Sequence, residues 1–171
     1  LSAALQAAGC LIHYARETQK SDLPHIQGIQ VERQEDSVIL DAASRRNLEL
    51  DINLAGGKDN TLLSVIDRTA TAMGSRLLSR WINRPLRDRA QLQQRQATVA
   101  ELKTDFRFEA LFELLKTIGD LERIIARLGL RSARPRDLAK LRDGLCQLPE
   151  LQQQLRPMTS TYVGELAKRI G

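Results

Sequence analysis

The sequence predicts a mainly α-helical fold, a helical bundle with a small β element of two or three short strands near the N-terminal third. Apolar residues recur at helical spacing through most of the 171 residues. Aromatic residues make up only 4% of the chain, so the core must be aliphatic, which favours helices packed on helices. A chain of this length buries roughly 70% of its unfolded surface, so it needs neither a metal nor a disulfide to fold.

The N-terminal third predicts one long helix followed by short elements. Apolar residues at steps of three and four predict an amphipathic helix that runs to about Thr18. Residues 20–28 are predicted to form a linker because they contain Ser, Pro and Gly. Residues 42–47 predict one helical turn. Three short segments, two of them rich in β-branched residues, predict strands: 29–32, 37–40 and 48–50.

From Asn60 onward the pattern is helical almost without a break. Asn60 or Thr61, Asp88 and Asp120 can each begin a helix, because their side-chain oxygens accept hydrogen bonds from first-turn amides. Proline lacks the amide proton that a helix interior requires. Pro85 therefore ends one helix, and Pro149 interrupts or kinks another. The apolar residues of the predicted helices lie at 62–66, 73–82, 92–102, 111–118, 121–128, 138–148 and 151–155, and a last short helix is predicted at about 162–170. Pro135 is expected near the start of the helix that carries residues 138–148.

Positive charge is concentrated in one part of the chain. The net charge is +5, and residues 120–142 hold seven basic but only three acidic side chains. On a continuous helix, arginines at steps of four, four and three share one face, which could lie along a DNA phosphate backbone. Alternatively they pair with carboxylates of neighbouring helices or of domains outside this chain, which we favour because no aromatic residue is interleaved for base stacking. These arginines are Arg123, Arg127, Arg131 and Arg134.

Targeting signals and membrane segments are not recognisable in the sequence. No stretch approaches the roughly 20 apolar residues that a membrane span requires, and nothing resembles a signal peptide. Cys10 and Cys146 are too few for a disulfide framework and suit a reducing compartment. We therefore expect a cytoplasmic protein without membrane contact. Because the chain starts at Leu1 inside an apolar run and stops at Gly171, we also expect a piece of a longer protein.

One segment resembles the end of a phosphate-binding loop but fails its chemistry. Residues 55–59 contain a Gly-Lys pair, yet Ile52 stands where the loop needs its first glycine. Asp59 stands where the loop needs Ser or Thr, and its negative charge would repel a phosphate. A plain turn is expected here.

Metal and acid–base sites are equally unsupported by the residue pattern. Cys10 and His13 lie one helical turn apart, but a zinc site needs three or four ligands, so we expect a buried thiol beside a polar residue. Glu35, Asp36 and Asp41 lie near a predicted β turn, where carboxylates are usually solvated. We predict no catalytic, cofactor-binding or metal-binding residue in this chain.

Trp81 is the single tryptophan and lies on an amphipathic helix. A lone tryptophan on an apolar face usually packs in the core, so we expect a structural role for this side chain.

Three stretches together resemble the core domain of the MutS family of bacterial DNA mismatch-repair proteins. They are residues 60–86 (NTLLSVIDRTATAMGSRLLSRWINRPL), 40–49 (LDAASRRNLE) and 119–138 (GDLERIIARLGLRSARPRDL). Their order and spacing match the family, and the resemblance covers nearly the whole chain. The opening helix is similar to the passage from the family's connector domain. The resemblance therefore implies connector passage in residues 1–25 and core domain in residues 26–171, without clamp or ATPase domains.

Most of what the resemblance implies about function concerns the longer mismatch-repair protein of which this chain is expected to be a piece. We call that longer protein the parent. The parent is expected to bind mismatched duplex DNA, to hydrolyse ATP with Mg²⁺, to pair with a second MutS subunit and to recruit MutL. The family's mismatch wedge and Walker motifs lie outside this chain, so no site residue is carried over. For this chain the implied role is a mechanical core that links DNA-contacting parts to the ATPase. The alternatives are a DNA-binding module acting through residues 123–142, and a free-standing helical adaptor.

Overall fold

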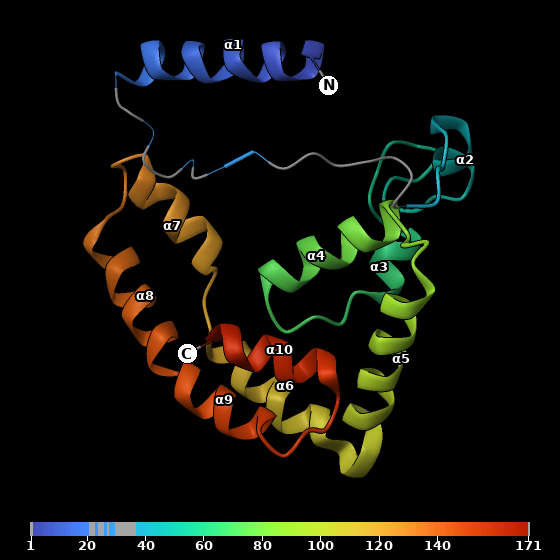
Figure 1. The fold of residues 1–171 in the computed structure, drawn as a ribbon. Coiled ribbons are helices and arrows are strands. Elements are labelled where there is room, and N and C mark those ends of the chain that lie inside the picture. The colour runs from blue at the N-terminus through green and yellow to red at the C-terminus, as the bar shows by residue number, and fades with distance from the viewer. Residues whose placement is uncertain (1, 21–22, 24–25, 27, 30–36, 171) are drawn as a thin grey trace.

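The described part of the chain, residues 2–20, 23, 26, 28–29 and 37–170 of a computed structural model, is mainly helical (Figure 1). The predicted fold class is confirmed in this respect. A 3₁₀ turn, η2 (Thr104–Phe106), links two of the helices. The α-helices are α1 (Ser2–Gln19), α2 (Ala42–Asn47), α3 (Leu62–Ile66), α4 (Ala72–Asn83), α5 (Arg89–Lys103), α6 (Arg107–Thr117), α7 (Leu121–Gly129), α8 (Pro135–Cys146), α9 (Leu148–Leu155) and α10 (Thr161–Ile170).

Five of the described helices, α2, α3, α4, α5 and α7, begin after a residue whose side chain accepts from a first-turn amide. Thr61 accepts from the amide of Ser64 at 3.2 Å, which confirms one of the two caps predicted for α3. Asn60, the alternative, adopts a left-handed backbone conformation instead. Asp88 and Asp120 cap α5 and α7 as predicted. The helix boundaries thus follow local hydrogen-bonding chemistry.

The predicted small β element is wrong for the described residues. Residues 30–36 lie outside the described part, and of the remainder only Ser37 makes an isolated antiparallel bridge, with Leu86. Residues 48–50 form a loop, because Glu49 has a left-handed φ of 45° that a strand cannot accommodate. The backbone carbonyls of Glu49 and Leu50 accept hydrogen bonds from the amides of Leu62 and Leu63 at the start of α3. They are therefore not available to pair with a neighbouring strand.

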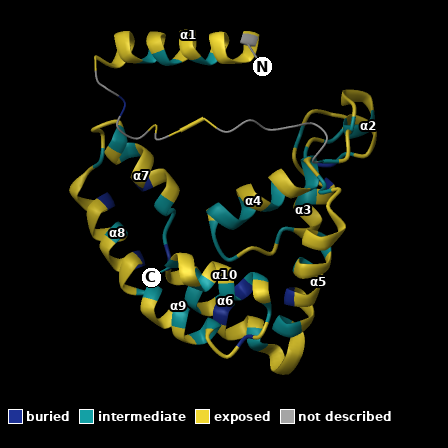
Figure 2. Cartoon of the chain, viewed as in Figure 1, coloured by how far each residue is buried: buried dark blue, intermediate teal, exposed yellow. Residues whose placement is uncertain are grey.

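The core lies among four helices that form the base of the structure (Figures 1 and 2). α10 packs against α9 and α5, and α6 packs against α5 and α9. Leu111, Ile118, Leu151, Met158 and Val163 form the buried cluster. This core is aliphatic apart from one methionine, as the aromatic-poor composition predicts.

The buried face of α5 agrees with the predicted one only in part: Leu102 packs against the core cluster and Leu92 is partly buried. Periodicity assigns Leu92, Val99 and Leu102 to the inner face, but Val99 is 55% exposed. Thr98 is buried in its place; its hydroxyl donates to the carbonyl of Gln94 and lies 2.6 Å from the hydroxyl of Ser160, which directly precedes α10. A polar contact therefore lies on the buried side of α5.

Helix α1 extends to Gln19, which confirms the predicted helix, and it lies apart from the other helices (Figure 1). Leu5, Leu11 and Tyr14 on this helix are all more than half exposed. Among the helices described, none combines the length and the apolar character that crossing a bilayer would require.

Candidate functional site

The four arginines predicted to share a helical face are divided between two helices and the turn that joins them. Arg123 and Arg127 lie on α7, which ends at Gly129. Arg131 follows in a left-handed conformation, and Arg134 directly precedes α8. The row is therefore not continuous along one helix.

Of these four arginines, Arg127 forms an ion pair with a described carboxylate. The guanidinium of Arg127 donates to Asp137 of α8 at 2.9 Å, and the backbone amide of Arg134 donates to the same carboxylate at 3.0 Å. The hydrogen bond from the Arg134 amide, followed by the charge of Arg127, holds the pKa of Asp137 below its usual value. Arg123 and Arg131 form no ion pair with any described residue, and DNA-backbone contact by this segment stays a prediction.

The segment that resembles a phosphate loop is a hydrogen-bonded turn, as expected. The amide of Gly57 donates to the side-chain oxygen of Asn53 at 2.8 Å, and the Asn53 side-chain amide donates to the carbonyl of Asp59 at 3.0 Å. Gly56 occupies a left-handed conformation with φ 86°, which glycine adopts without strain. The loop's polar groups are thus occupied by one another.

The residues considered for a metal or acid–base site do not come together in the described part of the chain. Cys10 is exposed, so the predicted buried thiol is wrong, because among the described elements none packs closely on α1. His13 lies 3.4 Å from Glu17 on the same helix, and the described residues contain no cluster of three metal-ligating side chains. Asp41 caps α2 by accepting from the amide of Ser44, while residues 35–36 lie outside the described part.

Trp81 lies at the surface rather than in the core, which corrects the expected core packing. It is 37% exposed, and the guanidinium of Arg95 from α5 lies 3.7 Å from its ring centre. This cation–π contact holds α4 against α5.

The densest charged contact in the described chain joins two helices that are far apart in sequence. Arg76 of α4 donates to both carboxylate oxygens of Asp120, at 2.8 and 2.7 Å. It also donates to Glu122 at 2.6 and 3.1 Å. We refer to Arg76, Asp120 and Glu122 as the Arg76 network. Sequence reasoning predicted Asp120 only as a cap, and no local pattern signals a pairing across 44 residues.

The electrostatics of the Arg76 network favour its charged form. The hydrogen bonds from Arg76 hold the pKa of Asp120 below its usual value, and both carboxylates raise the pKa of Arg76. Asp120 also accepts from the amide of Arg123 at 3.2 Å, so it caps α7 while it binds α4. One carboxylate therefore ties the backbone of α7 to a side chain of α4.

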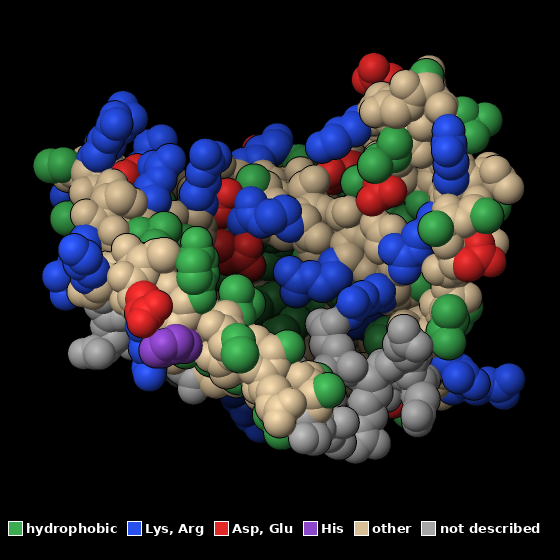
Figure 3. All heavy atoms as spheres, turned by 90° about the horizontal axis from the view of Figure 1, so that it is seen from above, with side chains coloured by type: hydrophobic (Ala, Val, Ile, Leu, Met, Phe, Trp, Pro, Cys, Tyr) green, Lys and Arg blue, Asp and Glu red, His purple; other side chains and the backbone are tan. Residues whose placement is uncertain are grey.

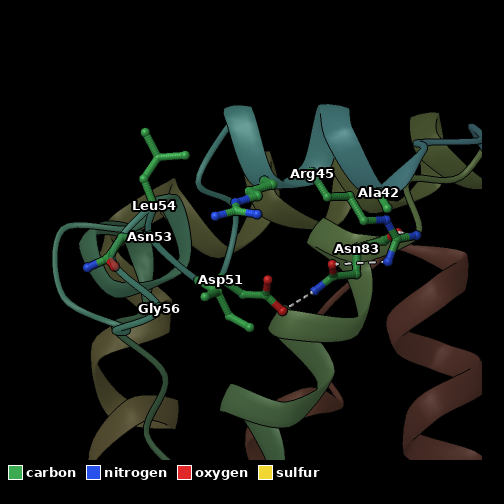
Figure 4. A pocket seen from close by; sticks show the side chains of 9 residues that line it. Ala42, Arg45, Asp51, Asn53, Leu54, Gly56 and Asn83 are labelled. Atoms are coloured by element: carbon green, nitrogen blue, oxygen red, sulfur yellow. Dashed lines mark hydrogen bonds between the residues drawn. The ribbon is translucent and has the colours of Figure 1, made fainter.

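A second polar contact anchors the other end of α4 and lines a pocket of about 410 Å³ (Figure 4). The side-chain amide of Asn83 donates to Asp51 at 2.9 Å, and the guanidinium of Arg45 donates to the Asn83 carbonyl at 3.0 Å. Arg45 also donates to the carbonyl of Leu40 at 3.2 Å. The two ends of α4 are thus fixed to α2 and its following loop on one side and to α7 on the other.

Comparison with known families identifies the chain. A family model described as MutS domain III matches residues 43–170, which cover α2 to α10. The chain belongs to the MutS domain III family. MutS domain III is a helical core domain of mismatch-repair proteins, and both anchors of α4 lie within the matched residues. The match also lies inside residues 26–171, the predicted core, whereas the connector assignment of residues 1–25 stays a prediction.

Proposed function

We propose that this MutS domain III is the mechanical core of a mismatch-repair protein and carries movement between DNA-contacting parts and the ATPase. The observation that carries the proposal is the Arg76 network. A guanidinium bound through both edges is restrained in distance and in orientation, because its planar fork matches carboxylate geometry. A displacement of α4 therefore acts directly on the first turn of α7.

The same route continues beyond α7 through close packing. A Cβ atom added at Gly144 of α8 would lie 2.9 Å from the side chain of Leu121 on α7, so these two helices are in tight contact. The ion pair between Arg127 and Asp137 joins them near their connecting turn. Packed helices rearrange between discrete arrangements, which makes such a path suited to coupling two remote sites.

The wider function is proposed at the level of the mismatch-repair protein that contains this domain. That protein binds mismatched duplex DNA, hydrolyses ATP with Mg²⁺, pairs with a second MutS subunit and recruits MutL. The nucleotide and its metal belong to the ATPase part of the protein. No residue of this chain is assigned to them, and the role proposed for this chain is positional.

The test uses that mismatch-repair protein with Arg76→Ala introduced. Loss of the guanidinium disconnects α4 from α7, so ATP-induced release from mismatched DNA should slow by about tenfold, equivalent to 1.4 kcal/mol of coupling. Mismatch affinity without ATP and ATP hydrolysis without DNA should stay within about twofold. Arg142→Ala is the matched control, because the ion pair that Arg142 makes among the described residues is with its sequence neighbour Asp143, at 2.6 Å.

The leucines on the two connected helices provide a second comparison. Leu77 of α4 and Leu128 of α7 are 42% and 37% exposed, so Leu77→Ala and Leu128→Ala remove little packing and should slow release less than Arg76→Ala does. The coupling role is wrong if these variants and Arg76→Ala lower the thermal unfolding temperature while ATP-induced release from mismatched DNA is as fast as in the unmutated protein.

A further inference from the structure

The pocket of about 410 Å³ beside α2 has no occupant in the coupling role proposed above. It is lined by residues of α2, of the loop that follows α2 and of the last turn of α4 (Figure 4). Pockets that hold small molecules measure roughly 300–1,000 Å³. This pocket therefore has room for one small ligand but not for a helix of another protein.

Hydrogen bonds within the chain hold the walls of the pocket in place. Arg45 of α2 donates to the backbone carbonyl of Asn83 on α4 at 3.0 Å. Asn53 accepts from the amide of Gly57 at 2.8 Å and donates to the carbonyl of Asp59 at 3.0 Å, which fixes the loop. Because these walls are already ordered, a ligand loses little affinity to ordering them.

Two charged groups of opposite sign in the lining keep binding capacity. The side chain of Arg46 on α2 makes no ion pair or hydrogen bond with any described residue. Asp51 accepts from the side-chain amide of Asn83 through Oδ2 at 2.9 Å, and its Oδ1 has no hydrogen-bond partner among the same residues. Since Arg46 and Asp51 do not pair with each other, both charges are available to a ligand.

The aliphatic part of the lining is also open to a ligand. Ile52 and Leu54 both line the pocket and are 51% and 59% exposed. A ligand that covers these side chains gains free energy by removing apolar surface from water. The pocket therefore suits a molecule with a negative group, a positive group and an aliphatic body.

The carboxylate of Asp51 is what distinguishes this pocket from the surrounding surface. Lys and Arg side chains outnumber acidic ones on the face seen from above (Figure 3). An anion alone therefore has many possible partners on the chain. A ligand that also carries a positive group gains a contact with Asp51 that those arginines and lysines do not offer.

We propose that this pocket binds a small zwitterion with an aliphatic body, the class formed by free aliphatic amino acids and aliphatic dipeptides. The ligand's carboxylate binds the guanidinium of Arg46, whose planar fork matches carboxylate geometry. Its ammonium donates to Oδ1 of Asp51, and its aliphatic part covers Ile52 and Leu54. The proposal does not rest on the coupling role, because it requires no movement of α4 or α7.

The experiment follows the backbone amides of the isotope-labelled 171-residue chain by NMR while a probe is added. L-leucine and leucyl-leucine are the two probes, and they distinguish a free amino acid from a dipeptide as the better ligand. We expect a dissociation constant of about 1 mM or lower for at least one of them, with shifts concentrated in residues 42–56. Glycine and glycylglycine, which lack the aliphatic body, should bind at least about tenfold more weakly.

Probes that lack one charge test each polar contact in turn. For the better probe, an amidated carboxyl or an acetylated amine should each weaken binding by about tenfold or more. In Arg46→Gln the free and amidated probes should bind within about twofold of each other, because the carboxylate has lost its partner. In Asp51→Asn the same should hold for the free and acetylated probes. Asparagine keeps an oxygen that can accept from the Asn83 amide.

A matched variant separates the pocket from the general positive charge of the chain. Arg87→Gln, at an exposed position outside the pocket lining, should keep the full preference for the free carboxylate. Arg46 is exposed, so Arg46→Gln should leave the helix content by circular dichroism unchanged. If Asp51→Asn unfolds the chain, the comparison of Arg46→Gln with Arg87→Gln decides alone.

Three results would each overturn the proposal. The first is the absence of saturable shifts with either probe up to about 20 mM. The second is equally tight binding of a probe blocked at both ends, which would make an internal peptide segment of a protein the occupant. The third is an unchanged preference for the free carboxylate in Arg46→Gln. ATP-induced release from mismatched DNA is measured separately, so failure here leaves the coupling role untouched.

Discussion

The carboxylate of Glu101 on α5 accepts a hydrogen bond from the backbone amide of Thr159 at 2.6 Å, across 58 residues of sequence. The same carboxylate accepts from the amide of Ser160 at 2.9 Å. It therefore satisfies two amides directly before α10 and ties this end of α10 to α5. The Thr159 amide in particular holds the pKa of Glu101 below its usual value.

Glu101→Gln should make the chain less stable at neutral pH and less sensitive to acid. Because the folded-state pKa of Glu101 is depressed, its contribution to stability is present above the unfolded value of about 4.5 and is lost as pH falls through the folded value. Urea unfolding at pH 7 and near pH 3 measures the difference. Glu109→Gln, at an exposed position on α6, is the control. Parallel pH dependence in both variants would show that Glu101 is not the titrating group.

The Arg76 network should show energetic coupling between its members. Arg76→Ala and Asp120→Asn, alone and together, form a double-mutant cycle in which the combined loss of stability is smaller than the sum. Asparagine keeps the capping oxygen, so the cycle isolates the ion pair. The coupling should shrink between about 0.05 and 0.5 M salt, because the pair is partly solvated. Additive losses would mean that Arg76 and Asp120 do not stabilise each other.

Thr61 is the most completely buried side chain described and should be sensitive to loss of its hydroxyl. The hydroxyl caps α3 and donates to the carbonyl of Lys58 at 3.0 Å. Thr61→Val should cost about 1–3 kcal/mol of unfolding free energy, since it leaves an amide and a carbonyl without partners. Thr61→Ser keeps both bonds and should cost clearly less. A Thr61→Val chain that melts at the temperature of the unmodified chain would show that the two hydrogen bonds of this hydroxyl contribute no net stability.

Gly144 should tolerate only the smallest side chain. Alanine gains about 0.8–1 kcal/mol in helix propensity, which offsets the shift that Leu121 must make away from the new Cβ atom. Gly144→Ala should therefore be nearly neutral, while Gly144→Leu should cost about 1–3 kcal/mol by overpacking. Adding Leu121→Ala to Gly144→Leu should recover part of that loss in urea unfolding. A Gly144→Leu chain as stable as the parent would show that α7 and α8 separate freely.

Arg95 should contribute to stability through the ring of Trp81. Arg95→Met keeps much of the aliphatic packing but removes the cation, and should cost about 0.5–1 kcal/mol. The emission of Trp81, the only tryptophan, follows unfolding directly. Arg87→Met, at an exposed position just before α5, should leave the midpoint unchanged. A similar shift in both variants would point to net charge rather than the ring contact.

Features that depend on neighbouring residues could be predicted from the sequence. Asp88 and Asp120 begin helices because each cap bonds amides within its own first turn, and Pro85 and Pro149 act through their own backbone. The turn in the chain between α5 and α6 was not predicted. Asp105 and Phe106 adopt left-handed conformations there, and no Gly or Pro in this stretch indicates a turn.

Features that depend on distant residues could not be predicted in this way. Residues 48–50 carry a strand-like alternation, but the carbonyls of Glu49 and Leu50 are used by α3, which only the folded chain reveals. The Arg76 network joins residues 44 and 46 positions apart, so no spacing rule contains it. The polar contact on the buried side of α5 likewise involves Ser160, which lies 62 residues beyond Thr98.

The bond between Glu101 and Thr159 has a consequence for folding during synthesis. A ribosome that adds about 5–20 residues per second needs roughly 3–12 s to make the 58 residues between them. During that interval α5 and α6 have no α10 to cover them, and aliphatic side chains such as Leu111 are open to chaperones and to other nascent chains. Slower translation through this stretch would lengthen that vulnerable period rather than assist folding.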